Sequence, residues 1–272
     1  MKGTILYKMT GSGNDFAMLD GRCTDPSQWP AARIAAVCDR RTGVGADGLV
    51  LLTPEEPDAV RMIYWNSDGS RAAMCGNAAL CSARLSVYLE MVPSGELRLL
   101  TDAGVIRARS GDSGESAEIN LLDFDAPAPV KGLEAAAGEH WLAFATVGVP
   151  HLVVRVDDID TVDVLGRGKS LRFDPALGSA GANVNFIAPS AGGSWLIRTY
   201  ERGVEGETLA CGTGTVAAAV ALAGRGEAPL PLRFRTRGGP DLAVRARLDG
   251  SRGTDVWLRG QGKLVFRAVW EA

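Results

Sequence analysis

The feature that most constrains this chain is an internal repeat. Cys75 and Cys211 each stand directly before a glycine, and each opens an apolar stretch of good helix-forming residues. Tyr64 and Tyr200 each precede their cysteine by eleven residues. The separation between the copies is therefore 136 residues at both positions, from 211 − 75 and from 200 − 64. A second copy of one motif predicts that the chain is built from two related units.

Two further features support the duplication. Leu49–Leu51 and Asn185–Ile187 are apolar, strand-like segments at the same separation of 136 residues. Polar turns at Gly13 and Gly148, each entering an apolar strand, lie 135 residues apart. We interpret the chain as a duplicated unit and expect two domains related by a pseudo-twofold axis.

Apolar periodicity and turn residues predict many short strands and few helices. Helices are expected over 31–38, 78–89 and 216–223, and 157–182 is expected to be mostly irregular with room for a short helix. Strands are expected over 3–9, 16–19, 49–52, 60–65, 97–101, 105–109, 117–122, 141–147, 152–156, 183–187, 195–200, 232–236, 242–247, 256–258 and 264–270. We predict an α+β fold in which each half is a mostly antiparallel sheet wrapped around a central apolar helix. The Pro-, Ala- and Gly-rich segment 123–136 is the expected linker.

Composition narrows the class of partner. The 272 residues include 29 basic and 32 acidic side chains of mixed order, which does not indicate a nucleic-acid or membrane surface. Five cysteines without disulfide-scaffold or Cys-x-x-Cys spacing predict a reducing, cytoplasmic location. Two histidines are too few for a histidine-rich metal site, and we predict no metal. The expected partner is a small molecule, and a homodimer is the assembly to test.

The two Cys-Gly motifs predict a particular chemistry. A helix N-terminus gathers free backbone N–H groups and the positive end of the helix dipole, which lowers a thiol's pKa and favours a bound carboxylate. Twofold symmetry would bring the two thiols to opposite faces of one substrate carbon. Inverting a stereocentre requires one base and one acid on opposite faces. We therefore predict racemisation or epimerisation by Cys75 and Cys211.

Each of these residues also has a structural interpretation. A lone cysteine beside glycine is usually a small buried residue, and we keep that interpretation for Cys23, Cys38 and Cys81. Glu201 and Arg202 form either a solvated ion pair or a site for a substrate's charged groups. By residue type alone, Asn14 and Asn183 are turn residues and His151 is a capping histidine. These alternatives stay open on the residues alone.

The motifs together resemble the diaminopimelate epimerase family, over almost the whole chain. They are Gly11-Ser-Gly-Asn-Asp-Phe16, Gly43-Val-Gly-Ala-Asp47, Asn66-Ser-Asp-Gly69, Met74-Cys-Gly-Asn77, Pro150-His151, Asn183-Val184, Glu201-Arg-Gly203 and Glu207-Thr-Leu-Ala-Cys-Gly-Thr-Gly214. The resemblance implies interconversion of LL- and meso-2,6-diaminopimelate by Cys75 and Cys211 without pyridoxal phosphate or another cofactor. It places that reaction in lysine and peptidoglycan biosynthesis.

The resemblance also implies roles for other residues and a domain plan. Backbone groups at Gly76, Asn77, Gly212 and Thr213 would hold the reacting carboxylate; Asn14, Asn66, Asn183 and Arg202 would bind the distal amino-acid end; Glu201 and His151 would tune the thiols and help to place the substrate. The first domain would comprise residues 1–121 with a returning strand at 262–272, and the second 122–261. The active site would lie in the cleft between them.

The sequence departs from the family pattern at four places. Val149 stands where an asparagine is usual, Gly48 where a glutamine is frequent, and Ala78-Ala-Leu80 where Gly-Ala-Arg is common. The stretch Val204–Glu207 carries one extra residue. Three alternatives remain: a racemase of another amino acid on the same scaffold, a duplicated domain that binds a small acid without catalysis, and a thiol-dependent redox sensor.

Overall fold

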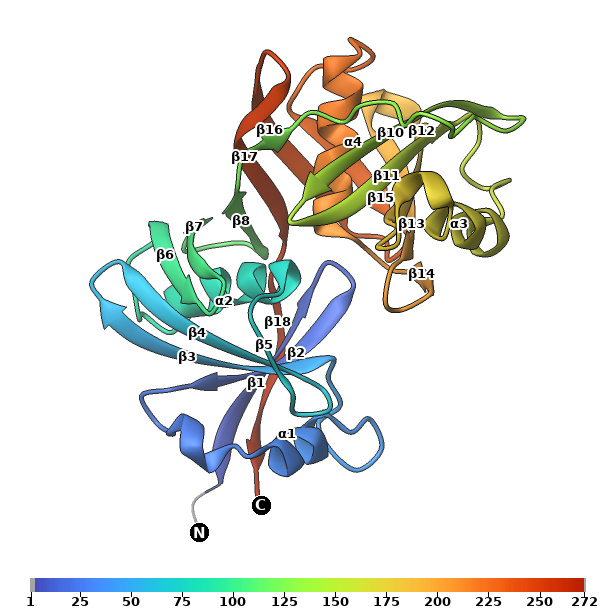
Figure 1. Ribbon diagram of the computed structural model, residues 1–272. Coiled ribbons are helices and arrows are strands. Elements are labelled where there is room, and N and C mark those ends of the chain that lie inside the picture. Colours follow the sequence, from blue (N-terminus) through green and yellow to red (C-terminus); the bar gives the residue numbers. More distant parts are fainter. Residues whose placement is uncertain (1–2, 272) are drawn as a thin grey trace. The chain divides into compact units, whose positions relative to one another are not determined.

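The computed structural model describes residues 3–271 and divides into two compact units. Unit 1 comprises Met1–Asn120 and Arg259–Ala272, and unit 2 comprises Leu121–Leu258 (Figure 1). The chain thus passes from unit 1 to unit 2 once and returns once. Within residues 3–271, no helix combines the length and the apolar character that crossing a membrane requires.

Unit 1 is a mixed sheet with a helix on each face. Its elements are β1 (Thr4–Gly11), β2 (Asn14–Asp20), a 3₁₀ turn (Pro26–Gln28), α1 (Ala31–Cys38), β3 (Gly48–Glu56), β4 (Ala59–Asn66), β5 (Arg71–Ala72), α2 (Gly76–Tyr88), β6 (Gly95–Thr101), β7 (Gly104–Ser110), β8 (Ser116–Leu121) and β18 (Lys263–Trp270). The strands pair in the order β18-β1-β2-β3-β4-β6-β7-β8. The pairs β2–β3 and β4–β6 are parallel and the others antiparallel.

Unit 2 repeats this plan. Its elements are β9 (Phe124–Asp125), β10 (Glu139–Val147), β11 (Val149–Val156), α3 (Val164–Arg172), β12 (Asn183–Pro189), β13 (Trp195–Glu201), β14 (Gly206–Thr208), α4 (Gly212–Gly224), β15 (Leu232–Thr236), β16 (Asp241–Asp249), β17 (Arg252–Gln261) and 3₁₀ turns at Pro175–Leu177 and Ala191–Gly193. The order β10-β11-β12-β13-β15-β16 corresponds to β1-β2-β3-β4-β6-β7 of unit 1, and in both series the second and fourth pairs are parallel. The predicted α+β fold with two repeated units is confirmed.

Strand register aligns the two units, and it corrects the sequence alignment by one residue. Trp65 lies opposite Leu49 in unit 1, and Tyr200 lies opposite Val184 in unit 2. The separation is 135 at both positions, from 200 − 65 and from 184 − 49. Pairing Tyr200 with Tyr64 was therefore wrong. An extra residue in the turn between β13 and β14 then makes the separation 136 at Cys75 and Cys211, so the two cysteines remain equivalent.

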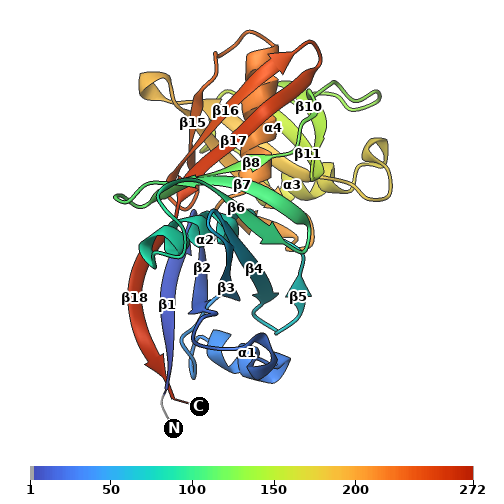
Figure 2. The ribbon, with the colours of Figure 1, turned by 90° about the vertical axis from the view of Figure 1, so that its left-hand side faces the viewer.

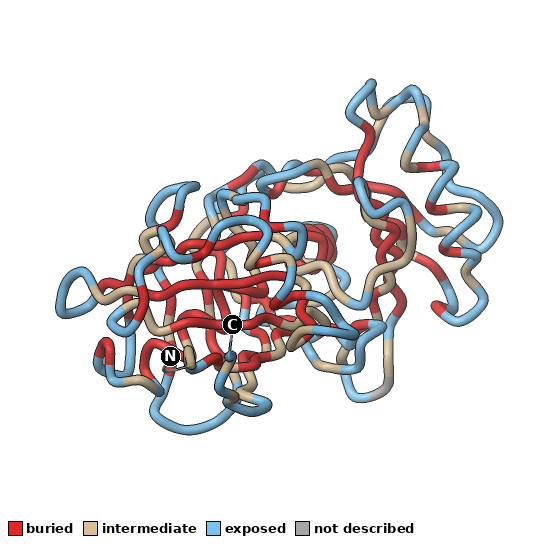
Figure 3. Tube along the Cα trace, turned by 90° about the horizontal axis from the view of Figure 1, so that it is seen from below, coloured by how far each residue is buried: buried red, intermediate tan, exposed pale blue. Residues whose placement is uncertain are grey.

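The helices that follow the cysteines are the most deeply buried. Every residue of α4 from Gly214 to Leu222 is buried, and so are ten residues of α2. A helix that is apolar around its whole circumference can be stable in water only when other elements cover all sides. Figure 3 shows burial along the whole chain, with long buried stretches in the interior and exposed connections at the surface.

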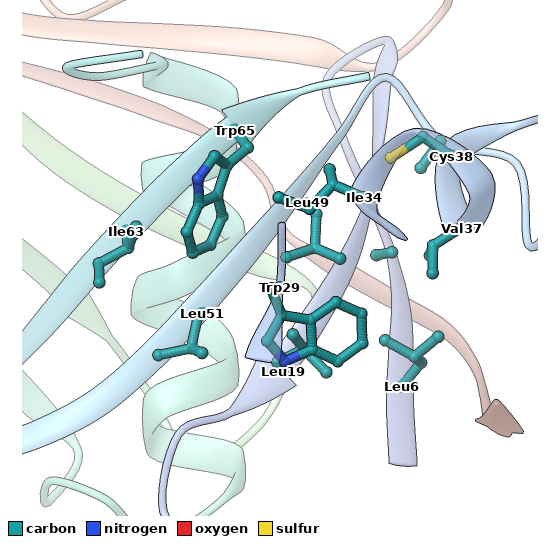
Figure 4. Close-up of a cluster of buried hydrophobic side chains, with 12 residues drawn as sticks. Leu6, Leu19, Trp29, Ile34, Val37, Cys38, Leu49, Leu51, Ile63 and Trp65 are labelled. Atoms are coloured by element: carbon teal, nitrogen blue, oxygen red, sulfur yellow. The ribbon is translucent and has the colours of Figure 1, made fainter. Parts of the chain in front are cut away.

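The opposite face of the unit 1 sheet is covered by α1. Ile34, Val37 and Cys38 of this helix pack with Trp29 on residues of β1 to β4, including Trp65 (Figure 4). In unit 2, α3 covers the corresponding face. It is the short helix of the otherwise mostly irregular stretch 157–182.

The segment 123–136 belongs to unit 2 rather than to a free linker. Phe124 and Asp125 pair with Gly253 and Arg252 of β17, and Ala128 forms a bridge with Phe144. The crossing between units occurs before this segment, at residues 120–121. Proline and glycine therefore marked an irregular but attached stretch, and the linker prediction was wrong.

Candidate active site

The two cysteines occupy the same backbone position in their units. Cys75 is the N-cap of α2 and Cys211 is the N-cap of α4, and both have extended backbone angles. The carbonyl of each cysteine accepts the first helical hydrogen bond, from the N–H of Ala79 and Thr215 respectively. The backbone N–H groups of the next three residues at each helix start lack helical partners. Each unit thus presents a thiol beside free helix N–H groups, an arrangement that favours a bound anion.

In unit 1 the start of α2 is tied to a polar chain. The Asn77 amide donates to Asn14 Oδ1 at 2.8 Å, and the Asn14 amide donates to Asp47 Oδ2 at 2.8 Å. Asn14 therefore uses both ends of its side chain within unit 1. This connects the start of α2 to the turn before β3.

Charged residues complete this chain. Arg40 contacts Asp47 Oδ1 at 2.6 Å and Asp15 Oδ1 at 2.7 Å, and the buried Lys8 contacts Asp15 and the Gly45 carbonyl. Burial alone would raise the pKa of Asp15, but hydrogen bonds from Arg40 and Lys8 outweigh burial and lower it to about 2. The unit 1 helix start is thus supported by ionised groups.

In unit 2 burial dominates the state of the cysteine. Desolvation, followed by the nearby Glu201 carboxylate, raises the pKa of Cys211 to about 12. The Gly214 N–H and the Thr213 hydroxyl act in the opposite direction. The expected lowering by the helix start is therefore present at Cys211 but is smaller than the effect of burial. Cys211 is protonated at neutral pH.

Glu201 and Arg202 lie at the end of β13, close to the start of α4. Burial raises the pKa of Glu201. The backbone N–H of Arg202 donates to Asn183 Oδ1 at 2.8 Å, and the Asn183 amide donates to the Pro150 carbonyl at 3.3 Å. Asn183 therefore joins the end of β13 to the strand that carries His151. Within residues 3–271, the Arg202 guanidinium forms no ion pair with a carboxylate of this chain.

His151 is fully buried in β11. Its Nε2 lies 2.9 Å from Thr213 Oγ1, and Thr213 Oγ1 lies 3.8 Å from Cys211 Sγ. Desolvation, and then the charge of Arg202, lower the pKa of His151 to about 3. This side chain is therefore neutral and belongs to the Cys211 helix start.

The remaining predicted residues occupy less connected positions. Asn66, at the end of β4, donates to Ser70 Oγ at 3.0 Å across its own turn. The described residues contain no group of three or more His, Cys, Asp or Glu side chains arranged to hold a metal ion. Cys38 and Cys81 are buried and Cys23 is exposed. Burial raises the pKa of Cys38 to about 11 and that of Cys81 further.

Four residues that support these helix starts had no predicted role: Arg40 and Asp47 in unit 1, and Asn185 and Thr199 in unit 2. Asp47 was quoted within a motif, but its contacts to Asn14 and Arg40 are made across the fold. Asn185 lies in a segment that the sequence predicts to be an apolar strand. A polar residue alternating with Val184 and Phe186 in that strand was the available signal.

Sequence comparisons agree with the arrangement of motifs. The family model described as "Diaminopimelate epimerase" matches residues 6–121 and 143–253. A diaminopimelate epimerase of Gemmatimonas aurantiaca is 45% identical over 273 residues, covering 96% of each chain. The diaminopimelate epimerase of Flavobacterium psychrophilum is 34% identical over 265 residues, covering 97% of this chain and 99% of that one. The chain belongs to the diaminopimelate epimerase family.

Solved structures show that the fold of this family extends to more distant proteins. A phenazine biosynthesis protein of the PhzF family from Enterococcus faecalis superposes with a TM-score of 0.71 at 15% identity, covering 99% of this chain and all of that chain. A hydroxyproline epimerase from Agrobacterium vitis gives a TM-score of 0.66 at 16% identity, covering 98% of this chain and 91% of that one. At these identities the likeness shows a shared fold.

The structure explains one departure from the pattern of the diaminopimelate epimerase family. A Cβ atom at Gly48 would lie 2.5 Å from the Trp65 carbonyl and 2.6 Å from the Tyr64 ring. The Tyr64 ring packs edge-on against Phe16, with ring centroids 6.1 Å apart. A longer side chain at position 48 has no room beside this pair. At position 149 the side chain is exposed, and nothing in the structure explains the valine there.

Proposed function

We propose that this protein converts LL-2,6-diaminopimelate into meso-2,6-diaminopimelate with Cys75 and Cys211 as its two catalytic residues. The observation that carries the proposal is the occurrence of one cysteine at the same helix start in each repeated unit. The names of the relatives support the substrate. The two helix starts would meet in a cleft between a domain of residues 1–121 with 262–272 and a domain of residues 122–261.

In the proposed reaction one thiolate removes the α-proton and becomes a thiol. The opposite thiol then donates its proton to the other face of the carbon and becomes a thiolate, so that the protons balance and the roles are exchanged. Because Cys211 is protonated at neutral pH, it would start as the acid and Cys75 as the base. The reverse reaction would begin with Cys211 as the base.

The helix starts would stabilise charge on the substrate. N–H groups at Gly76 and Asn77, and at Gly212 and Thr213, would hold the reacting carboxylate and the negative charge that grows as the proton leaves. Such a reaction would need no pyridoxal phosphate, because the helix N–H groups would stabilise the carboxylate and the carbanion.

Other polar groups would place the rest of the substrate. Arg202 has no carboxylate partner within the described residues, and its cation suits the distal carboxylate. Three asparagine side chains would contact the distal amino acid: Asn14, Asn66 and Asn183. Each would use the amide donors or acceptors that its partners in the same unit do not occupy. Glu201 and His151 would tune the thiols. The reaction would serve lysine and peptidoglycan biosynthesis in the cytoplasm.

The test is exchange of the α-proton in deuterated water. The unmodified protein should label LL- and meso-diaminopimelate at the α-carbon, and Cys75→Ala and Cys211→Ala should each lower epimerisation by at least about a thousandfold, a loss of about 4 kcal/mol of transition-state stabilisation. Cys81→Ala serves as the matched cysteine control and should remain active. Full epimerase activity in both catalytic-site variants would contradict the proposal.

A panel of simple amino acids tests the substrate separately. Exchange at a monocarboxylic amino acid, without exchange at diaminopimelate, would replace the substrate but keep the two-base reaction. Ligand binding that survives the loss of both thiols, without any exchange, would favour a binding protein.

We also propose that the protein is a homodimer. Strand β18 pairs along its length with β1 and is the outer strand of that sheet in Figure 2. Four apolar side chains of these two strands are about half exposed: Ile5, Val265, Phe266 and Val269. An exposed apolar edge strand favours association with a second copy. Sedimentation should show a dimer that Val269→Lys weakens; a monomer at all concentrations would contradict this.

A further inference from the structure

The buried polar groups behind Cys211 form a continuous chain that the proposed reaction does not yet use. Asn185 and His151 are fully buried, and Thr199 is nearly so. The Asn185 amide nitrogen lies 3.3 Å from His151 Nδ1, and Thr199 Oγ1 lies 3.0 Å from Asn185 Oδ1. With the His151–Thr213 and Thr213–Cys211 contacts, the chain runs from Thr199 to the thiol.

The orientation of the Asn185 amide is fixed by its surroundings. The amide nitrogen also lies 3.2 Å from the Leu152 carbonyl oxygen and 3.5 Å from the Asn183 carbonyl oxygen. Carbonyl oxygens only accept hydrogen bonds, so an amide oxygen at this position would face two acceptors. The NH₂ group must therefore occupy it, and Thr199 donates to the oxygen on the other side.

This orientation determines where His151 carries its proton. The NH₂ group of Asn185 donates to Nδ1, so Nδ1 must be the unprotonated nitrogen of the ring. The proton then resides on Nε2, which donates to Thr213 Oγ1. An imidazolium would place a second N–H against the Asn185 NH₂ group, so the chain also opposes protonation. The charged side chain that faces the ring is Arg202, which opposes it as well.

The same step orients the Thr213 hydroxyl. Because its oxygen accepts from His151, its hydrogen is available to Cys211, whose thiolate can only accept. We propose that Asn185 is a positioning residue that fixes His151 in the Nε2–H tautomer, so that Thr213 donates a hydrogen bond to the Cys211 thiolate formed during epimerisation. This inference rests on the proposed function of Cys211.

The repeat provides an internal comparison. Strand registers place His151 at the position of Phe16, Asn185 at that of Val50 and Thr199 at that of Tyr64. In unit 1, Phe16 and Tyr64 form an aromatic contact beside Val50. The fold therefore tolerates an apolar residue where Asn185 stands, and burying a polar amide there is unfavourable without a hydrogen-bonding purpose.

The first test observes the tautomer directly, without substrate. The chain has two histidines, so ¹⁵N-histidine labelling gives two ring systems, and His151→Gln assigns them. His140, whose Nε2 lies 2.6 Å from exposed Asp157, is the reference. At neutral pH we expect a protonated Nε2 and an unprotonated Nδ1 for His151. A proton on Nδ1, or an imidazolium, would overturn the proposal.

Variants test whether Asn185 is the cause. Asn185→Val, which introduces the unit 1 residue, should abolish the preference for one tautomer, and Asn185→Asp should draw a proton onto Nδ1. Asn183→Leu is the matched control, because the Asn183 side chain bonds to Pro150 and Arg202 instead of the ring. If these variants misfold, the ¹⁵N measurement on the unmodified protein still tests whether His151 carries its proton on Nε2. An unchanged tautomer in a folded Asn185→Val protein would overturn the role of Asn185.

The last test concerns the thiolate. Thr213→Val keeps the backbone N–H but removes the hydroxyl, and Thr213→Ser restores it. Thr213→Val should lower kcat about ten- to hundredfold with little change in KM, and Thr213→Ser should recover most of it. Alkylation of Cys211 by iodoacetamide should be slower in Thr213→Val than in the unmodified protein, and Thr213→Ser should recover most of the rate. Alkylation needs no substrate, so an effect on alkylation without any epimerase activity would refute the proposed function alone. Equal rates of Cys211 alkylation in Thr213→Val and Thr213→Ser would refute the proposed hydrogen bond from Thr213 to the thiolate.

Discussion

The two helix starts share one backbone design but have different support. In unit 1, Asn77 is tied through Asn14 to the ionised groups Asp47, Arg40, Asp15 and Lys8. In unit 2 the equivalent residue, Thr213, is tied through His151 to Asn185 and Thr199, all of them neutral. Duplication preserved the position of the cysteine, while the polar surroundings became different.

This difference has a physical consequence for the thiols. Ionised groups need water or partners, and in unit 1 Arg40 remains largely exposed while it pairs with two carboxylates. A neutral chain can be buried completely without leaving a charge unpaired. Unit 2 thus places Cys211 beside neutral groups, and desolvation keeps it a thiol at neutral pH by raising its pKa to about 12.

The largest expected effect is on acid stability, and it comes from His151. Its pKa in the folded protein, about 3, lies below its ordinary value of 6.5. As pH falls below 6.5, His151 binds a proton in the unfolded chain but stays neutral in the folded chain. The stabilisation is thus complete above pH 6.5 and is lost as pH falls towards 3, by about 1.4 kcal/mol per pH unit.

Urea unfolding of the unmodified protein and of His151→Gln, from about pH 7.5 to about pH 4.5, measures this effect. The difference in unfolding free energy between the unmodified protein and His151→Gln should change by about 1.4 kcal/mol per pH unit. His140→Gln is the control and should keep the slope of the unmodified protein. Equal slopes in all three proteins would contradict a buried, neutral His151.

Unit 1 should respond to acid at lower pH and by a smaller amount. The pKa of Asp15 is lowered to about 2 from 3.8, so its stabilisation is present above about pH 4 and is lost as pH falls towards 2. Asp15→Asn should destabilise the protein at neutral pH, and the difference from the unmodified protein should shrink by about 2 kcal/mol over that window. A difference independent of pH would show that Asp15 is not ionised in this network.

One position of α2 carries a methyl group that the equivalent position of α4 lacks. Ala78 in α2 corresponds to Gly214 in α4, from 214 − 78 = 136. A Cβ atom at Gly214 would lie 2.0 Å from Asn185 Oδ1. Gly214→Ala should therefore displace Asn185 and lower the unfolding free energy by about 1–3 kcal/mol, although alanine favours helices. Thermal unfolding, with Gly224→Ala as the control, measures this; a more stable Gly214→Ala protein would contradict the contact.

Salt should separate the two kinds of support. Asp47→Asn removes an ionised partner of Arg40 and should cost about 1–2 kcal/mol in dilute buffer, and less at high ionic strength. Thr199→Val removes a neutral donor and should cost about 1 kcal/mol at either salt concentration. Denaturant unfolding at about 0.05 M and about 1 M NaCl compares them. The same salt dependence for both variants would remove the distinction between the units.

The smallest effect is expected at the end of α4. Gly224 is the last residue of this helix, and a Cβ atom there meets nothing within 4 Å. Gly224→Ala should stabilise the protein by about 0.5–1 kcal/mol, because glycine loses more backbone freedom on folding. A destabilised variant would show that the helix end needs the freedom of glycine.

The sequence alone determined the repeat, the α+β class, the two helices after the cysteines and the family. These follow from local patterns: a Cys-Gly pair before an apolar run predicts a buried helix start, and the same pair recurs at a fixed separation. Family membership needs the order of the motifs along the chain, which is also written in the sequence. The pairing of Tyr64 with Tyr200 was one residue out, because the extra residue in the turn after β13 shifts Cys211 relative to that strand, and the strand register is what reveals the shift.

The tertiary structure alone decided which groups support each thiol. Asp47 meets Asn14 across 33 positions, and Asn185 meets His151 across 34. Such contacts depend on strand order and on which face a side chain points to, and neither is visible in spacing. Burial is likewise a property of the folded chain. The sequence predicted a thiol pKa lowered by a helix start, but the pKa of Cys211 is raised, because desolvation of its thiolate outweighs the hydrogen bonds from Gly214 and Thr213.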